Sequence, residues 1–294
     1  MQFQKITIVG VGLLGGSIGL AVRRGRLVRE VAGFVRRAAS LKDCERAGAV
    51  DYAVTDLLAA VSNADLIILC TPLAQMRSLA EQIMPTVKRG AIVTDVGSVK
   101  AGVVRELESI IARAGAYFVG SHPMAGGEKM GVLAARADLF DNAVCIVTPT
   151  KKSHALAVRK VEQFWKSLGA RVLKMDAAQH DSLVSRSSHL PHVVAATLAN
   201  LVLNPAGPKM QAALCATGFR DTTRVASGSP EMWRDIALAN RKNVSQSVDA
   251  FVVELKKFQG ALKRGDARAI ENFYATAKQR RDHWCAGMKT KMED

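Results

Sequence analysis

The histidine in the most chemically suggestive context is His122, within the glycine-rich stretch 120–127 (GSHPMAGG). This stretch follows a predicted strand, and open α/β sheets bind their ligands beyond the carboxyl ends of their strands. A neutral imidazole at that edge can accept a proton near pH 7. Residues 95–100 (DVGSVK) follow another predicted strand and bring Ser98 to the same edge. We therefore expect a general base with a hydroxyl group beside it.

Two further polar motifs lie in the second half of the chain. Residues 187–192 read SSHLPH and residues 218–224 read GFRDTTR. The planar guanidinium of Arg224 is suited to bidentate binding of a carboxylate. If these two loops converge with the two loops of the first half, one cleft holds a base, a hydroxyl and a carboxylate anchor. An anionic small-molecule substrate is the expected ligand.

The first strand ends in a glycine turn. Gly10, Gly12 and Gly15 fit the pattern G-x-G-x-x-G between a short apolar strand and a helix. The first glycine permits a tight turn, the second lets a pyrophosphate approach the backbone, and the third lets the helix pack closely on the strand. The helix N-terminus offers free N–H groups to the phosphates. The expected cofactor-binding residues are Gly10, Gly12, Leu13, Leu14, Gly15, Arg36, Arg37, Ser40, Thr71 and Pro72.

The end of the second strand bears on the choice between NAD and NADP. Enzymes that use NAD commonly place an acidic residue there, which accepts from the ribose 2′-OH. No acidic residue occurs from Ala32 to Leu41. Arg36 and Arg37 stand there instead and could pair with a 2′-phosphate, with Ser40 adding a hydroxyl group. This favours NADP, with NAD as the alternative.

Predicted strands and helices alternate up to about residue 175, which indicates βαβ units and a mainly parallel sheet. Strands are predicted at residues 5–10, 30–35, 65–71, 91–95, 117–119, 144–148 and 171–175. Helices are predicted between them at residues 14–24, 40–47, 75–84, 100–114 and 153–168.

Beyond residue 176 the sequence predicts helices alone. They are expected at residues 179–187, 190–203, 209–215, 230–262 and 267–288. Ser229-Pro230-Glu231 is a favourable helix start, because serine caps, proline suits the first turn and glutamate complements the dipole. The predicted fold is thus α/β, with an N-terminal Rossmann-type doubly wound parallel sheet in residues 1–176 and an all-helical C-terminal domain in residues 177–294.

The composition argues against several classes of protein. The net charge is +15 over 294 residues, but the basic residues are scattered and aromatic residues make up only 5%. That pattern does not favour nucleic-acid binding. The five cysteines are widely spaced, which predicts neither a disulfide framework nor a metal site. We find no signal peptide and no apolar run long enough to span a membrane, so a cytoplasmic protein is expected.

Taken in order, five motifs resemble the prephenate/arogenate dehydrogenase family. They are G-x-G-x-x-G-G-S, D-V-G-S-V-K, G-S-H-P-M-A-G, S-H-L-P-H and F-x-D-x-T-R, and the resemblance spans Lys5 to about Arg280. It implies a Rossmann-type domain, a helical dimerisation domain, an active site between them and a homodimer.

The same resemblance implies residue roles. His122 is similar to the catalytic base of the family, and Ser98 to the hydroxyl group that orients the base and the substrate. Arg224 resembles the arginine that binds a substrate carboxylate. Weaker matches give substrate-side roles to Ser188, His192, Asp221 and Glu128.

The implied reaction is oxidation of prephenate or arogenate with loss of CO2, on the way to tyrosine. Hydride leaves ring C4 for the nicotinamide while the base takes the hydroxyl proton. The sequence has no clear acidic partner for the arogenate amine, which favours prephenate or dual use, with an arogenate-specific enzyme as the alternative. A β-hydroxyacid dehydrogenase would need a lysine on a helix of the second domain, and none stands out. An NADP-sensing regulator that binds nucleic acid is the remote alternative.

Overall fold

The computed structural model describes residues 3–127, 129–208 and 210–293, and the side chains from residue 288 onward lie outside the description. The chain forms two compact units, Met1–Asn240 and Arg241–Asp294.

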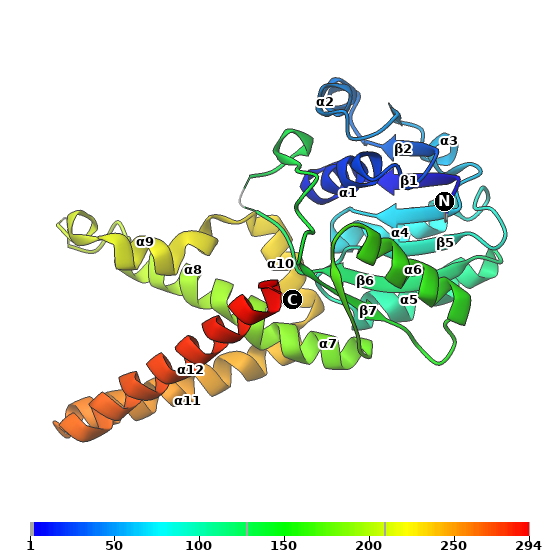
Figure 1. Cartoon of the computed structure of the whole chain (residues 1–294). Helices are drawn as coiled ribbons and strands as arrows, with labels where there is room; N and C mark the ends of the chain where they lie inside the picture. The colour runs from blue at the N-terminus through cyan, green and yellow to red at the C-terminus, as the bar shows by residue number, and fades with distance from the viewer. Residues whose placement is uncertain (1–2, 128, 209, 294) are drawn as a thin grey trace. The chain divides into compact units, whose positions relative to one another are not determined.

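The first unit is built on one eight-stranded sheet with the strand order β3-β2-β1-β4-β5-β6-β7-β8 (Figure 1). All neighbouring strands run parallel except β6 and β7, which are antiparallel. This confirms the predicted Rossmann-type sheet. The strands are β1 Lys5–Val9, β2 Glu30–Phe34, β3 Tyr52–Val54, β4 Leu66–Leu69, β5 Ile92–Asp95, β6 Tyr117–Pro123, β7 Val144–Thr148 and β8 Arg171–Lys174.

Helices cover both faces of this sheet because its strands are apolar on both sides. In β1, Ile8 packs into the cluster under α1 and α6, whereas Val9 packs into the cluster under α3, α4 and α5. Ile68 and Leu69 of β4 divide in the same way, as the two-residue period of a strand requires. The helices are α1 Leu13–Arg24, α2 Ala39–Ala47, α3 Leu57–Val61, α4 Leu73–Ile83, α5 Ala101–Arg113 and α6 Ala155–Ser167.

The described part of the chain after β8 contains helices and no strand. In the first unit these are α7 Ala177–Val184, a π-helical turn Ser185–His189, α8 Leu190–Val202, α9 Thr217–Thr223 and α10 Pro230–Ala239. The second unit is a pair of helices, α11 Arg241–Lys263 and α12 Ala267–Glu293. Ser229 accepts a hydrogen bond from the backbone N–H of Met232, so α10 begins at the predicted cap.

Several local predictions were wrong. The segment 187–192 is not a loop, because it continues α7 into α8 through the π-helical turn. Residues 218–223 lie within α9 rather than in a loop. The short elements β3 and α3 were not predicted, since each is only a few residues long. The predicted helix at 209–215 is only a 3₁₀ turn at Ala212–Leu214, and residue 209 lies outside the description.

The predicted helix at 230–262 divides at Asn240. This residue ends α10, and its side-chain amide donates 2.8 Å to the backbone oxygen of Asp181. A buried amide that is used in this tertiary hydrogen bond explains the break, which helical periodicity alone does not reveal.

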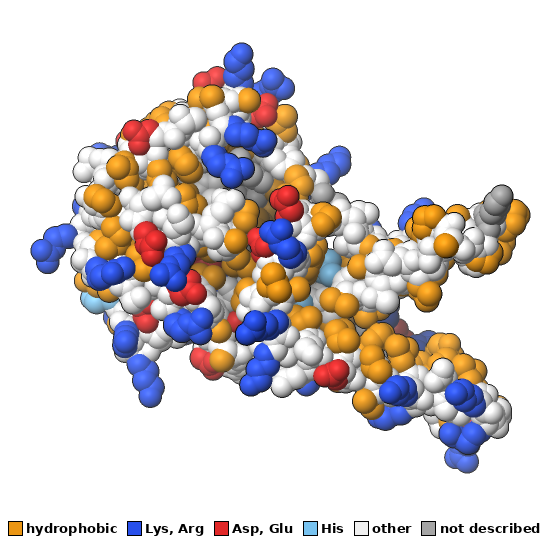
Figure 2. Space-filling view, turned by 180° about the vertical axis from the view of Figure 1, so that it is seen from behind, with side chains coloured by type: hydrophobic (Ala, Val, Ile, Leu, Met, Phe, Trp, Pro, Cys, Tyr) orange, Lys and Arg blue, Asp and Glu red, His pale blue; other side chains and the backbone are white. Residues whose placement is uncertain are grey.

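Basic side chains on the face shown in Figure 2 are spread out, with acidic side chains among them. They form no continuous basic stripe on that face. No helix among the described residues is both long enough and apolar enough to cross a membrane.

Candidate active site

The turn between β1 and α1 is shaped by two glycines that no other residue can replace without strain. Gly10 has φ +99°, and a Cβ atom there would lie 2.8 Å from the backbone oxygen of Cys70. A Cβ atom at Gly15 would lie 2.2 Å from the backbone oxygen of Gly10. Both distances are far below ordinary contact, so the helix start is held tightly against the strand end.

Gly12 differs from these two, because a Cβ atom there would meet no heavy atom within 4 Å. The open space lies at the N-terminus of α1, where the backbone N–H groups of Leu13 and Leu14 have no partner within the helix. Beside the turn, the buried hydroxyl of Thr71 has no hydrogen-bond partner in the described part of the chain. Unsatisfied donors around an open space fit a dinucleotide pyrophosphate.

The remaining predicted cofactor residues lie at neighbouring strand ends. Pro72 caps the N-terminus of α4, directly after Thr71. Arg36 and Arg37 are exposed between β2 and α2, and Ser40 lies half-buried in the first turn of α2. Neither arginine forms an ion pair with a described residue, so both guanidinium groups are available to an anion.

His122 lies in β6 and is buried, with 7% of its surface exposed. Its Nδ1 atom lies 2.8 Å from Nε2 of His180 in α7. The Nδ1 atom of His180 lies 2.8 Å from Oδ1 of Asp181. Burial lowers the pKa of His122 well below 6.5, and the ammonium group of Lys100 lowers it further. His122 is therefore a neutral base at pH 7, anchored through one ring nitrogen.

Asp181 receives further hydrogen bonds at the start of α5. Its Oδ1 atom accepts from the backbone N–H of Lys100 at 2.7 Å, and its Oδ2 atom accepts from the N–H of Ala101 at 2.9 Å. A carboxylate suits this position, because the N-terminus of a helix carries partial positive charge. The carboxylate thus joins α7 to the loop that carries Ser98.

A buried ion pair connects the same loop to β6. Lys100 pairs with Asp95, and both side chains are fully buried. The Nζ atom of Lys100 also donates 2.9 Å to the backbone oxygen of Ser121, next to His122. Asp95 accepts from the backbone N–H of Ser121 at 3.2 Å. These contacts fix the end of β5 against the strand that carries the histidine.

An aromatic wall is formed by residues of the π-helical turn, α8 and α10. His192 stacks on Trp233 with ring centroids 3.6 Å apart, and its Nδ1 atom donates 2.9 Å to the backbone oxygen of Ser188. His189 is buried beside Trp233, and burial lowers its pKa to about 4. The indole Nε1 of Trp233 is buried without a hydrogen-bond partner among the described residues. This unsatisfied donor favours a hydrogen-bond acceptor in a ligand at this wall.

The remaining predicted site residues are Ser98, Arg224, Asp221 and Glu128. Ser98 lies half-buried between β5 and α5, and its hydroxyl group makes no hydrogen bond to a described residue. Arg224 is exposed where α9 ends. Asp221 is exposed and pairs with Arg220 at 3.4 Å. Glu128 lies outside the described residues.

The sequence did not single out the residues that anchor His122. A histidine followed by an aspartate near the start of the first C-terminal helix was a usable signal, since the chain contains only six histidines. The burial of His180 and Asp181 depends on their packing against α5, and the sequence alone does not show that packing.

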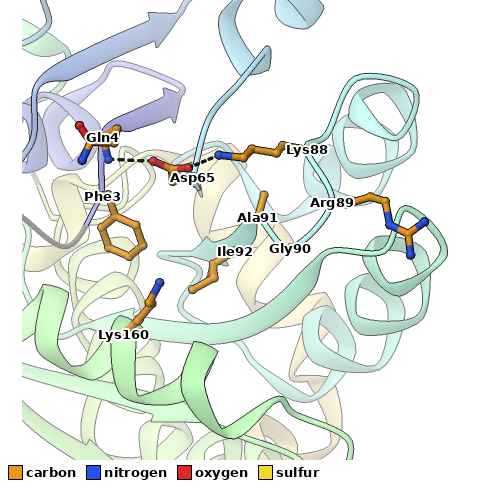
Figure 3. Close-up of a pocket in the computed structure, with 9 residues that line it drawn as sticks. All are labelled: Phe3, Gln4, Asp65, Lys88, Arg89, Gly90, Ala91, Ile92 and Lys160. Carbon is orange, nitrogen blue, oxygen red and sulfur yellow. Dashed lines mark hydrogen bonds and ion pairs between the residues drawn. The ribbon is translucent and has the colours of Figure 1, made fainter.

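A cavity of about 180 Å³ lies at the opposite, amino edge of the sheet, lined by residues at the starts of β1, β4 and β5 and by Lys160 of α6 (Figure 3). Lys88 is paired there with Asp65 at 2.6 Å, and Arg89 points away from the cavity. None of the predicted site residues lines it. The residues gathered at the carboxyl edge are therefore the candidate site.

The chain is similar over nearly its whole length to known dehydrogenases. Residues 18–174 match the family model described as prephenate dehydrogenase, nucleotide-binding domain, and residues 176–279 match prephenate dehydrogenase, dimerization domain. The prephenate dehydrogenase of Bacillus subtilis is 34% identical over 280 residues, which cover 94% of this chain and 75% of the relative. The cyclohexadienyl dehydrogenase of Zymomonas mobilis is 33% identical over 284 residues, which cover 95% of each chain.

A solved structure shares the fold. It is the crystal structure of prephenate dehydrogenase from A. aeolicus in complex with hydroxyphenyl propionate and NAD+. The two structures agree with a TM-score of 0.89 at 31% identity, over 95% of this chain and 98% of that chain.

Proposed function

The chain belongs to the prephenate dehydrogenase family, and from this premise we propose that it oxidises prephenate with hydride transfer to a nicotinamide dinucleotide. The products are CO2 and an aromatic phenol, on the route to tyrosine. Aromatisation drives the reaction, so the protein needs to supply placement of the two reactants, a base and an anchor for the carboxylates.

The observation that carries this proposal is His122, neutral and anchored at the edge of the sheet that also carries the glycine turn. Its Nε2 atom has no hydrogen-bond partner among the described residues and is the atom that would take the proton of the C4 hydroxyl group. Bound nicotinamide supplies the hydride acceptor. We assign binding of a substrate carboxylate to Arg224 and contact with the substrate hydroxyl to Ser98, with His192 and Ser188 at the far end of the substrate. Supporting roles for Asp221 and Glu128 complete the proposed site.

Incubating the purified protein with prephenate and each nicotinamide cofactor, while following reduced-nicotinamide absorbance, tests this function. Arogenate in place of prephenate is the matched comparison. We expect prephenate to be used at least as well, because the sequence offers no clear acidic partner for the arogenate amine. Turnover of arogenate alone would instead favour the arogenate-specific alternative.

We further propose that the preferred cofactor is NADP. Arg36 and Arg37 stand exposed just beyond the end of β2, with no ion-pair partner among the described residues, where an NAD enzyme commonly carries an acid. Arg36→Ala should weaken NADP use by about 1–3 kcal/mol, the scale of a charge-assisted hydrogen bond. NAD use should barely change. Equal losses in kcat/KM for both cofactors, or a wild type that prefers NAD, would remove Arg36 from phosphate recognition.

A homodimer is the proposed assembly, with residues 1–176 binding the dinucleotide and residues 177–294 contributing substrate contacts and the dimer interface. The match of residues 176–279 to a dimerization domain supports this. So do the exposed apolar side chains of Leu201 and Leu214, each 74% exposed. Light scattering at micromolar concentration should give the mass of two chains. The five cysteines are free thiols, which fits the cytoplasm as the proposed compartment.

A further inference from the structure

His180 and Asp181 lie behind His122 and take no direct part in the reaction proposed above. We propose that His180, held by Asp181, is a positioning residue that fixes His122 in the tautomer whose Nε2 atom carries no hydrogen. The catalytic consequence rests on the proposed function, whereas the tautomer itself does not.

The direction of the hydrogen bonds follows from Asp181. Two backbone N–H groups at the start of α5, those of Lys100 and Ala101, point at its oxygens from 2.7 and 2.9 Å. The side chain is thus held as a carboxylate, which can only accept hydrogen bonds. Because Oδ1 lies 2.8 Å from Nδ1 of His180, that nitrogen must carry a hydrogen.

A neutral imidazole has one N–H group and one bare nitrogen. With its hydrogen on Nδ1, His180 presents a bare Nε2 atom to Nδ1 of His122, 2.8 Å away. The His122 nitrogen must then be the donor, which leaves its Nε2 atom bare. Without this partner, His122 could carry its hydrogen on either nitrogen, and only one of the two tautomers can accept a proton at Nε2.

The reverse order of donors would need a positively charged His180, and the surroundings disfavour it. His180 is fully buried, and the ammonium group of buried Lys100 acts electrostatically on His122 beside it, so a second positive charge in this interior is costly.

The other ionisable groups around His122 and His180 are either ion-paired or uncharged. Asp95 of β5 is paired with Lys100. Cys145 of β7 has its pKa raised by burial, so it stays a neutral thiol. Asp181 is therefore the negative charge to which His180 is bonded.

The side chains of His180 and Asp181 are also held in place by burial and by a further hydrogen bond. Both His180 and Asp181 are at most 2% exposed, and the amide of Asn240 donates 2.8 Å to the backbone oxygen of Asp181. The ring of His122 is held by packing as well, since it contacts the ring of His180 edge to face at 5.1 Å between centroids.

Two substitutions separate a positioning role from a purely structural one. His180→Leu removes the acceptor for Nδ1 of His122. His180→Gln keeps it, because the glutamine carbonyl reaches about as far as Nε2 of histidine. His154→Gln is the matched control, since His154 is exposed and stacks on Tyr117 at the start of α6.

The tautomer can be read without substrate from the ¹⁵N spectrum of histidine-labelled protein. Only six histidines contribute, and the signals of His122 are identified by their loss in His122→Asn. We expect Nδ1 of His122 to be protonated and Nε2 bare in the wild type and in His180→Gln. In His180→Leu a share of the molecules should carry the hydrogen on Nε2.

Kinetics give the second readout. His180→Leu should lower kcat, up to the factor of about 10²–10⁴ that a general base contributes. KM should change little, because no substrate contact is removed. His180→Gln should recover most of the rate, and His154→Gln should match the wild type.

Three results would overturn the proposal. The first is a wild-type His122 protonated at Nε2, the second is a doubly protonated His180 at neutral pH, and the third is a His180→Gln variant that is as slow as His180→Leu. If instead the protein does not oxidise prephenate at all, the proposed function fails while the spectrum still decides the tautomer.

Discussion

Replacing glycine by alanine should have opposite effects on folding at Gly12 and at Gly15. At Gly12 an added methyl group meets open space, whereas at Gly15 it would lie 2.2 Å from a backbone oxygen. We therefore expect Gly12→Ala to fold normally and to bind the cofactor poorly. Gly15→Ala should be unstable before any ligand is added.

The magnitudes follow from these surroundings. Gly12 has φ −98°, which alanine adopts without strain, so its free energy of unfolding should change by less than about 1 kcal/mol. Its methyl group would occupy the space that we propose for the pyrophosphate, and overpacking of this size costs about 1–3 kcal/mol, or roughly 5- to 150-fold in Kd. For Gly15→Ala the clash falls on the folded protein, and a loss of about 1–3 kcal/mol should outweigh the better helix propensity of alanine.

Urea denaturation and a fluorescence titration with NAD or NADP measure the two quantities on each variant. The wild type and both variants are compared under the same conditions. Unchanged cofactor affinity in a folded Gly12→Ala protein would mean that the open space is not the pyrophosphate site. Full stability of Gly15→Ala would mean that the turn can relax, and that its tight packing does not define the site.

Three further predictions concern substrate, pH and stability. Arg224→Ala should raise KM by about 10- to 150-fold, the worth of a charge-assisted hydrogen bond of about 1.5–3 kcal/mol, and an unchanged KM would exclude this carboxylate anchor. Because burial lowers the pKa of His122 below 6.5, the base stays unprotonated down to lower pH. The acid limb of kcat/KM should thus lie below pH 6.5, and a limb at or above that value would contradict the assignment. Lys100→Met leaves the buried carboxylate of Asp95 without its ion-pair partner. It should lower the free energy of unfolding, measured by urea denaturation, by about 3–5 kcal/mol. Lys88→Met, which breaks an exposed pair, should cost about 1 kcal/mol or less, and equal losses would refute the difference.

Local patterns were sufficient for the parts of the fold that rest on local physics. The glycine turn, the apolar strands and the capped start of α10 at Ser229 are each specified by a few adjacent residues. His122 does lie at the carboxyl edge of the sheet, but within β6 itself and not in the loop that was expected after residue 119, because the strand continues through polar residues to Pro123.

Features that depend on distant contacts were missed. The residues around His180 predict only a histidine in a helix, because its burial against His122 depends on the packing of α7 on α5. Asn240 looks like a position inside a long helix until its amide bonds to the backbone of Asp181. The ion pair of Lys100 with Asp95 spans only five residues, but its complete burial follows from strands and helices that the sequence does not place relative to it.

The central claim is that His122 is the base for oxidation of prephenate, and steady-state kinetics of His122→Asn test it most directly. Asparagine keeps a polar side chain at the position but cannot take up the hydroxyl proton. With prephenate and the preferred cofactor, kcat should fall by about 10²–10⁴-fold. KM should stay close to that of the wild type, because the carboxylate anchor is untouched. A variant that retains near-normal kcat would contradict the account.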